Sequence, residues 1–416
     1  MTFPRTRLKF LLSRSDAGAW GDDAPDDDGV PVLRSTDIDL LGRIDGSNAA
    51  IRRLSGREKF ATRLEREDIL VVKSSGSDAH LGKSGYVESS DTPVYFSNFL
   101  QRLRVVAQVE PRFVWYFLNS QDMKSQIREI SSTTTGLQNL TGGVLGEAAV
   151  PCPPLSDQRR IADFLDVETA HIDELDAARS RHLELLQELS AAHVASAFEL
   201  EATVPKVRLG YLATIQTGVT VDASRSAGSD AVTRPYLRVA NVQAGYLDLN
   251  QITEITVPRR LAAASTLQAG DVLMTEGGDL DKLGRGTVWE GQIEGCLHQN
   301  HVFAVRVNRG ALDADYLAML TRATPARIHF ESTGNKTTNL ASTSSSKIRE
   351  LRVPLPPISR QRAVVAEVKA ALAAIEAIAS AVRCQRKLLA ERRQALITAA
   401  VTGQFDVTTA GCVGAE

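Results

Sequence analysis

Two long stretches of the chain, residues 155–201 and 358–396, repeat apolar residues every three or four positions. This spacing is the heptad pattern of coiled-coil helices. Each stretch follows a run of prolines and contains an early serine, Ser156 or Ser359, that can cap a helix. We therefore expect two helices of about 40 residues, each roughly 60 Å long. The positions expected on their contact seams are Ile161, Leu165, Ile172, Leu175, Leu186 and Leu189 in the first stretch, and Val365, Val368, Leu372, Ile375, Val382 and Leu389 in the second.

The regions that precede these helices, residues 1–150 and 205–353, have a different pattern. Short runs such as DILVVK, QRLRVVA, DVLMTE and HVFAVRV alternate apolar and polar residues or are rich in β-branched residues, and turns separate them. RFVWYFLNSQDMKSQIREI and ADYLAMLTRATPARIHFES have the pattern of helices that follow strands. Both regions are therefore expected to be globular α+β domains.

The two halves of the chain repeat each other. PCPPLSDQRR at 151–160 is matched by PLPPISRQRA at 354–363, an offset of 203 residues. EDILVVK is matched by GDVLMTE, and PVLRSTDI by PYLRVANV, in the same order and at nearly the same offset. The chain is thus two tandem copies of one unit, each a domain followed by a helix. The expected segments are 1–150, 151–204, 205–353, 354–405 and a tail at 406–416.

Charge distinguishes the two helices. Residues 155–201 contain 4 basic and 11 acidic residues, a net charge of −7, whereas residues 358–396 contain 8 basic and 3 acidic residues, a net charge of +5. Heptad helices of opposite sign favour pairing with each other over pairing with a copy of themselves. Because each helix follows an equivalent domain, a pseudo-twofold arrangement predicts an antiparallel coiled coil.

A glycine-rich turn in the first copy, SSGSDAHLGKSG at 74–85, resembles a phosphate-binding P-loop. Five residues separate Gly76 from Gly82, one more than the P-loop has. The second copy reads TEGGDLDKLGRG, so that Lys83 becomes Arg285 and the serine that would hold Mg²⁺ becomes Gly286. Both copies keep a glycine turn followed by one basic residue. This suits close approach to a phosphodiester or a base edge, and it is equally consistent with a plain hairpin that exposes a cation.

A polar loop precedes each proline-rich helix start: SSTTTGLQNLTGG at 131–143 and STGNKTTNLASTSSSK at 332–347. Amide side chains can bond an adenine edge, and hydroxyls suit phosphates, although a solvated loop would have the same composition. Residue type, loop position and recurrence select candidate DNA contacts in both domains. They are Arg34, Lys73, Lys83, Gln138 and Asn139 in the first domain, and Arg238, Lys282, Arg285, Gln299, Asn300, Lys336 and Asn339 in the second.

Composition adds mainly exclusions. The 416 residues have a formal net charge of −2, so a DNA-binding surface must be local, and weak DNA binding by the isolated chain is expected. The four cysteines lie far apart, which favours free thiols in a reducing cytoplasm. His171, His182 and His193 are spaced by eleven residues, about 16 Å per step along a helix, too far apart to share a metal. No apolar run is long enough to span a membrane, and no metal site or catalytic residue set is found.

These features resemble the specificity subunits of Type I restriction-modification systems, the HsdS family. The resemblance rests on PCPPLSDQRRIADFL and PLPPISRQRAVVAEV after two variable domains, on the paired glycine-rich elements, on HQNHVFAVRV at 298–307 and on the TGLQNLTGG loop. It covers essentially the whole chain. Asp157 and Arg360 stand where the family often has Glu, and the first helix is unusually acidic.

The resemblance implies a non-catalytic subunit of a prokaryotic, cytoplasmic complex that defends against foreign DNA. Each domain would be a target recognition domain for half of a split duplex DNA sequence, and the helices would set the spacer between the halves. The helices would also dock two modification (methyltransferase) subunits and, through them, restriction and translocase subunits. S-adenosylmethionine, ATP and Mg²⁺ would be bound by those partners and not by this chain.

Other functions remain compatible with the residues alone. A related specificity subunit could serve a Type IIB-like fused nuclease and methylase, which neighbouring genes would distinguish. A nucleotide hydrolase using the glycine-rich turn would bind ATP. A coiled-coil scaffold would have no DNA role, and the paired amide-rich loops argue against it.

Overall fold

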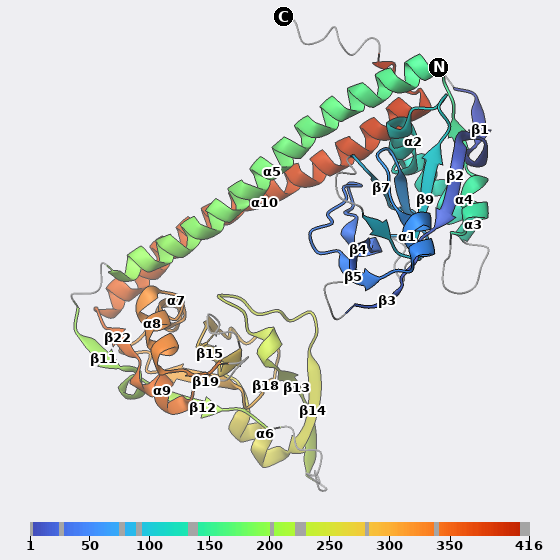
Figure 1. Cartoon of the computed structure of the whole chain (residues 1–416). Helices are drawn as coiled ribbons and strands as arrows, with labels where there is room; N and C mark the ends of the chain where they lie inside the picture. The colour runs from blue at the N-terminus through green and yellow to red at the C-terminus, as the bar shows by residue number, and fades with distance from the viewer. Residues whose placement is uncertain are drawn as a thin grey trace, which may run out of the picture. The chain divides into compact units, whose positions relative to one another are not determined.

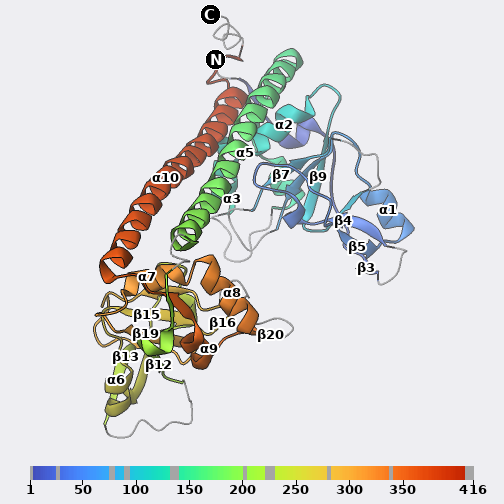
Figure 2. The same ribbon diagram turned by 90° about the vertical axis from the view of Figure 1, so that its left-hand side faces the viewer.

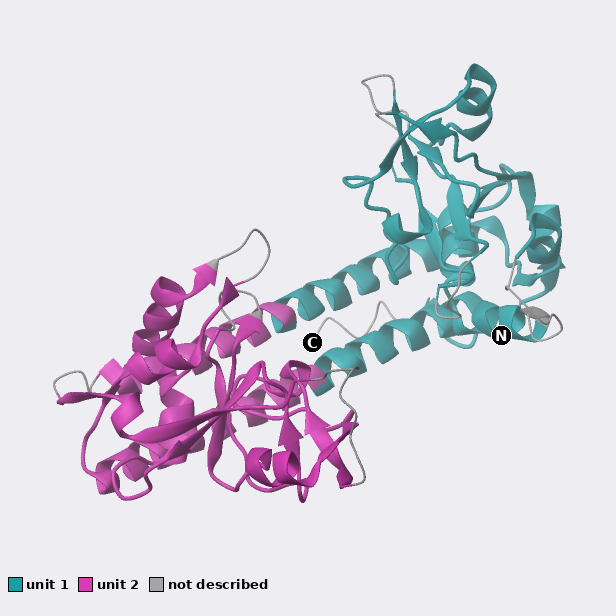
Figure 3. Ribbon diagram, turned by 90° about the horizontal axis from the view of Figure 1, so that it is seen from below, with its two compact units in different colours: residues 1–179, 384–416 teal, residues 180–383 magenta. Residues whose placement is uncertain are grey.

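The computed structural model describes residues 3–24, 29–74, 80–88, 94–131, 140–199, 204–220, 230–278, 283–336 and 341–407. Its contacts divide the chain into two compact units (Figure 3). Unit 1 contains residues 1–179 and 384–416, and unit 2 contains residues 180–383. Each unit therefore holds one α+β domain together with parts of both long helices, α5 (Leu155–Glu199) and α10 (Ile358–Thr402).

In unit 1 an antiparallel sheet with strand order β2–β9–β6–β7 lies beside a second sheet with order β3–β5–β4–β8. Every residue of the strand Ile69–Val72 is buried, because alternate side chains enter two different clusters of the core. The strands are β1 (Arg5–Arg7), β2 (Leu12–Ala17), β3 (Asp22–Asp23), β4 (Val30–Leu33), β5 (Ala50–Arg53), β6 (Ile69–Val72), β7 (Ser84–Tyr86), β8 (Tyr95–Phe96), β9 (Leu100–Val105) and β10 (Ala149–Pro151). The helices, apart from short 3₁₀ turns, are α1 (Gly56–Thr62), α2 (Pro111–Leu118), α3 (Gln121–Ser131) and α4 (Gly142–Gly146).

Unit 2 repeats this plan in the same order (Figures 1 and 2). Its antiparallel sheet has the order β12–β19–β15–β17, and its second sheet has the order β14–β13–β18. The strands are β11 (Lys206–Arg208), β12 (Ala213–Thr217), β13 (Ala231–Leu237), β14 (Thr253–Pro258), β15 (Asp271–Thr275), β16 (Gly277–Gly278), β17 (Gly286–Val288), β18 (Leu297–His298), β19 (Val302–Val307), β20 (Asn335–Lys336), β21 (Ala341–Ser342) and β22 (Arg352–Pro354). The helices are α6 (Arg259–Ser265), α7 (Ala314–Leu320), α8 (Thr324–Thr333) and α9 (Ser345–Glu350).

A short strand pair closes each domain just before its long helix. β1 pairs antiparallel with β10, and β11 pairs antiparallel with β22. The first strand of each domain is thus fixed to the residues that lead into the prolines and the helix. The tandem repeat, the α+β class and a long helix after each domain are confirmed.

Gln158 and Gln361 join each domain to the start of its helix through the same hydrogen bonds. The backbone N–H of Glu110 donates to Gln158 Oε1 at 2.9 Å, and Gln158 Nε2 donates to the Pro153 carbonyl at 2.8 Å. In unit 2, the N–H of Asp313 donates to Gln361 Oε1 at 2.9 Å, and Gln361 Nε2 donates to the carbonyls of Pro356 and Ala311, each at 2.9 Å. Both amide side chains are buried.

Gln361→Ala is expected to destabilise unit 2 by about 2 kcal/mol, because it leaves buried backbone groups of the domain without hydrogen-bond partners. Urea unfolding of the full chain measures this change. Gln187→Ala is the control, since Gln187 is an exposed residue of the same unit and should change stability by less than about 0.5 kcal/mol. Equal effects of the two substitutions would contradict an anchoring role for Gln361.

The two long helices pair antiparallel, as their opposite charges and the pseudo-twofold arrangement of the repeat predict. In unit 1, Arg393 Nη1 donates to Asp173 Oδ1 at 2.7 Å, and Arg386 donates to both oxygens of Asp176 at 2.7 and 2.9 Å. Asp173 precedes Asp176 on α5, whereas Arg393 follows Arg386 on α10, so the helices run in opposite directions. The two arginines interrupt the apolar heptads, and the structure shows that each pairs with an aspartate of the other helix.

The seam residues differ in burial. Ile161, Leu165, Ile172 and Leu186 of α5 are buried, as are Val365, Val368 and Val382 of α10. Leu372, Ile375 and Leu389 are half-buried. Leu175 and Leu189 are exposed by 47% and 52%, so they face away from the helix contact within their units.

Acid is expected to weaken the helix contact in unit 1 through Asp176. The hydrogen bonds from Arg386 hold the pKa of the Asp176 carboxyl below its ordinary value of 3.8. A depressed pKa contributes stability above the unfolded-state pKa, and that stability is lost as the pH falls through the folded-state pKa. Melting temperatures of the wild type and of Asp176→Asn, measured from about pH 6 to about pH 2, should therefore approach each other as the pH falls below about 3.8. Parallel curves over the whole range would rule out this linkage.

Within the described residues, no helix has both the length and the hydrophobicity needed to cross a membrane.

Candidate nucleic-acid interface

The second sheet of unit 2 brings three predicted contact residues to one edge. β13 and β18 are parallel, so the residues that follow them, Arg238, Gln299 and Asn300, lie together. The backbone N–H of Gln299 donates to the Leu237 carbonyl at 2.8 Å, and Gln299 Oε1 accepts from the N–H of Val239 at 3.3 Å. This edge presents an exposed guanidinium beside two half-buried amide side chains. Guanidinium and amide groups are the usual readers of base edges and phosphates.

A close approach of backbones holds this edge in place. A Cβ at Gly218 would lie 2.1 Å from the His298 carbonyl oxygen and 2.4 Å from that of Gln299, so only glycine fits. The N–H of Val219 donates to the His298 carbonyl at 2.8 Å. The buried ring of His298 bonds the Val302 carbonyl through Nδ1 at 2.6 Å, and its burial lowers the pKa of His298, so the ring is neutral at pH 7.

The equivalent arginine of unit 1 is engaged within its own domain. Arg34 donates to both carboxylate oxygens of Asp37, at 3.3 and 3.0 Å, and to the Asn48 carbonyl at 2.6 Å. In unit 2 the residue three positions after the arginine is the neutral Asn241, whose Oδ1 accepts from the backbone N–H of Arg238 at 2.8 Å. The equivalent turns of the two units therefore differ: Arg238 is exposed, whereas Arg34 pairs with Asp37.

Lys83 also bonds within its own domain. Its Nζ donates to the carbonyl of Ser35 at 3.1 Å and to that of Ile38, which ties the glycine-rich turn to the loop after β4. Burial lowers the pKa of Lys83, and Asp39 partly offsets this effect. Lys73 lies half-buried at the end of β6, where its backbone carbonyl accepts from the N–H of Leu140 at 2.7 Å.

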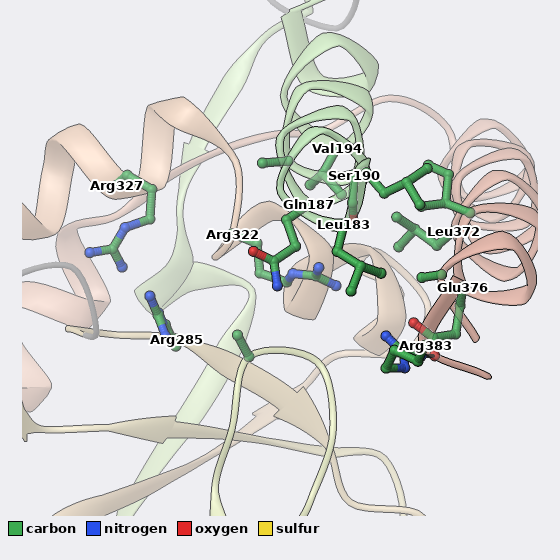
Figure 4. A pocket seen from close by; sticks show the side chains of 15 residues that line it. Leu183, Gln187, Ser190, Val194, Arg285, Arg322, Arg327, Leu372, Glu376 and Arg383 are labelled. Carbon is green, nitrogen blue, oxygen red and sulfur yellow. Dashed lines mark hydrogen bonds and ion pairs between the residues drawn. The ribbon is translucent and has the colours of Figure 1, made fainter. Parts of the chain in front are cut away.

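Arg285, the counterpart of Lys83, does not have an equivalent environment in unit 2. It lines a cavity next to the long helices, together with Arg322 and Arg327 (Figure 4). Gln138, Asn139, Lys282 and Asn339 lie outside the described residues, as does the side chain of Lys336. The backbone of Lys336 is in β20, which pairs with β21, and β21 pairs with β16. The polar loop of unit 2 thus begins beside its glycine-rich turn.

The glycine-rich turns do not form P-loops. Gly82 and Gly284 have left-handed backbone conformations, with φ of +77° and +63°, and each turn leads into a strand, β7 or β17. A P-loop requires a helix to begin at this point, so that its N-terminus faces the phosphates. Ser84, which would hold Mg²⁺, is buried and donates to the Gly82 carbonyl. Among the described residues, no group of histidine, cysteine or acidic side chains could hold a metal ion.

Two ion pairs with buried aspartates were not among the sequence-based candidates. Asp68 directly precedes β6 and Asp271 begins the equivalent strand β15. Each aspartate accepts two hydrogen bonds from an arginine of the neighbouring strand, Arg104 or Arg306, at 2.7 to 3.0 Å. Each aspartate also accepts from a backbone N–H three residues earlier, at 2.8 Å. The sequence signal was the aspartate shared by EDILVVK and GDVLMTE.

His301 was also missed as a site residue, although it lies in the quoted run HQNH. It is exposed next to Asn300, and its Nδ1 bonds Glu276 Oε2 at 2.5 Å. The backbone N–H of Glu276 also donates to the His301 carbonyl at 2.9 Å. This pair adds a second polar group beside the edge formed by Arg238, Gln299 and Asn300.

Comparison with known proteins agrees with this architecture. A family profile described as Type I restriction modification DNA specificity domain matches residues 37–185. The specificity subunit of the type I restriction enzyme EcoKI from Escherichia coli K12 is 24% identical over 392 residues, which cover 91% of this chain and 83% of that subunit.

Solved structures share the fold at low sequence identity. A chain from a structure that addresses complex assembly and conformational transition of the type I R-M system has a TM-score of 0.69 and 16% identity, and it covers 97% of this chain and 98% of its own length. The HsdS subunit from Thermoanaerobacter tengcongensis has a TM-score of 0.52 and 17% identity over 97% of both chains. The chain thus carries a Type I restriction modification DNA specificity domain at residues 37–185, and over 91% of its length it is similar to the specificity subunit of a Type I restriction enzyme.

Proposed function

We propose that each α+β domain of this specificity subunit recognises one half of a bipartite duplex DNA target. The observation that carries the proposal is the repeat itself: equivalent turns follow β4 and β13 in the two domains, but their side chains differ. Arg34 is paired with Asp37, whereas Arg238 is exposed beside Gln299. Domains with the same backbone plan and different polar edges are suited to reading different half-sites.

The same proposal gives the helices a docking role. Exposed apolar residues remain on both helices within each unit: Val167, Leu175 and Leu388 in unit 1, and Leu185, Leu189 and Ile378 in unit 2. Contact with another protein would cover these side chains. The proposed partners are two modification subunits, which would bind S-adenosylmethionine and flip the target adenine. Restriction subunits that use ATP and Mg²⁺ would join through them, and the helices would set the unread spacer.

Adenine methylation mapped by single-molecule sequencing tests this function, in cells with and without the gene. We expect a split, asymmetric motif whose methylation disappears on deletion. Exchange of residues 1–150 for another recognition domain should then change one half of the motif and leave the other half intact. A motif that survives deletion, or an exchange that changes both halves, would contradict the proposal.

Arg238→Ala is expected to weaken binding of the assembled modification complex to its mapped DNA target by about 1–3 kcal/mol if Arg238 bonds a base. Fluorescence anisotropy measures the binding free energy, with duplexes in which one or the other half of the target sequence is altered. Discrimination should be lost only in the half read by unit 2. Arg34→Ala is the matched comparison, and it should change domain stability more than DNA affinity. Equal DNA-binding losses for both variants would contradict the distinction between the two arginines.

A further inference from the structure

A cavity of about 510 Å³ lies inside unit 2, between its domain and the two long helices (Figure 4). The walls contributed by the helices are mostly apolar, with Leu183, Leu186 and Val194 from α5 and Leu372 and Ile375 from α10. The domain contributes Ala244 and three arginines, Arg285, Arg322 and Arg327. The cavity therefore has an apolar side and a cationic side.

The arginines of this cavity differ in their partners. Four arginines line the cavity with one acid, Glu376, and that carboxylate pairs with Arg383 on its own helix. Arg327 donates to the Leu283 carbonyl at 2.5 Å and lies 3.7 Å from Glu331, an exposed acid of α8. The half-buried guanidinium of Arg322 makes no hydrogen bond or ion pair with any described residue. Its burial and the nearby charge of Arg285 lower the pKa of Arg322.

The equivalent region of unit 1 is filled by the chain's own polar side chains. There, Lys124 donates to Gln394 Oε1 at 2.7 Å, and Gln394 Nε2 donates to the Asn119 carbonyl at 3.1 Å. Arg393 bonds Asp173, which also pairs with Arg43. This network joins the domain to both helices.

The 203-residue offset of the repeat shows what differs in unit 2. Arg322 and Arg327 correspond to Asn119 and Lys124. On the helices, Ser190 and Ala191 replace Arg393 and Gln394, and Ala379 replaces Asp176. Long polar side chains on the helices have become short ones, while a neutral residue of the domain has become an arginine. The result is open volume beside an unpaired cation.

We propose that this cavity is a phosphate-binding site in which Arg322 is the principal anchor. Guanidinium groups bind phosphate oxygens in a bidentate geometry, so a phosphate would supply the partner that Arg322 lacks among the described residues. The apolar wall leaves room for an organic group attached to the phosphate. The phosphoryl group could belong to a free nucleotide or to the backbone of bound DNA.

Isothermal titration calorimetry of the full chain with pyrophosphate and with ADP is the first measurement. Arg322→Gln should weaken pyrophosphate binding at least tenfold. Ser190→Glu places a carboxylate on the cavity wall, so it should also weaken binding while raising the melting temperature. Arg260→Gln removes an exposed arginine of α6 and should leave binding unchanged.

Binding to duplex DNA at several salt concentrations distinguishes the two sources of phosphate. If DNA supplies it, Arg322→Gln lowers duplex affinity for every sequence and reduces the slope of log K against log[salt] by about 1. If a small molecule supplies it, ADP binding falls in this variant while duplex binding and its salt slope stay unchanged. Either pattern supports a phosphate site.

The proposal is overturned if a folded Arg322→Gln chain binds pyrophosphate, ADP and duplex DNA as the wild type does. It is also overturned if the substitution weakens only the binding of an acidic protein partner. Melting curves of each variant establish that it is folded. Because these measurements use the isolated chain, they do not depend on the methylation result that tests the proposed function.

Discussion

Asp271→Ala should destabilise unit 2 by about 3 kcal/mol, because it removes a buried carboxylate that accepts several hydrogen bonds. Asp271 is 1% exposed and accepts three hydrogen bonds, two from Arg306 and one from the backbone N–H of Gln268. Removal of the carboxylate breaks all three bonds at the start of the central strand β15. Thermal and urea unfolding of the full chain measure the effect. Asp68→Ala should have a similar effect in unit 1, where Arg104 is the partner.

An exposed ion pair of the same unit provides the control. Asp230 and Arg259 lie 3.1 Å apart with side chains 71% and 67% exposed, so Asp230→Ala should change stability by less than about 1 kcal/mol. Replacement of both Asp271 and Arg306 by apolar residues should cost less than the single change, since no guanidinium is left without its hydrogen-bond partner. A single variant as stable as Asp230→Ala would show that Asp271 is not the buried anchor described above.

Gly18→Ala should destabilise unit 1 by about 3 kcal/mol, because the added methyl group has no space. A Cβ at Gly18 would lie 2.1 Å from the Phe96 carbonyl oxygen and 2.4 Å from that of Ser97, so β2 and the end of β8 would have to separate. Gly218 makes the corresponding contact in unit 2, where a separation would displace Gln299. Unfolding by urea and hydrogen exchange of the residues around Phe96 measure the expected change.

Gly56→Ala is the matched substitution in the same domain. Gly56 is the first residue of α1, and a Cβ there would meet nothing within 4 Å. Alanine should therefore be neutral or stabilise the chain by up to about 1 kcal/mol through its helix propensity and the loss of freedom in the unfolded state. If Gly18→Ala proved as mild as Gly56→Ala, the backbones would not be as closely packed as the structure shows.

The architecture could be predicted from the sequence because it is encoded in local patterns that recur along the chain. Heptads predicted both long helices, and the 203-residue offset predicted the tandem domains. Opposite charge predicted that the helices pair with each other, and the equivalence of the two domains predicted the antiparallel direction. Comparison of the two glycine-rich turns already argued against a P-loop, since Ser84 becomes Gly286. The strands that follow both turns agree with that conclusion. These features depend on neighbours in sequence or on internal repetition, both of which one chain displays.

Which basic side chains stay exposed was decided only by tertiary contacts. Arg34 and Arg238 have the same place in the repeat, but Asp37 pairs with one and Asn241 leaves the other exposed. Lys83 bonds two backbone carbonyls, whereas its counterpart Arg285 lines a cavity. Leu175 and Leu189 fit the heptads but are exposed, because the partner helix covers only one side of α5. The sequence gives the charge of each side chain, but the partners of that side chain come from segments far apart in the chain. Packing alone therefore determines whether the charge is neutralised, buried or exposed.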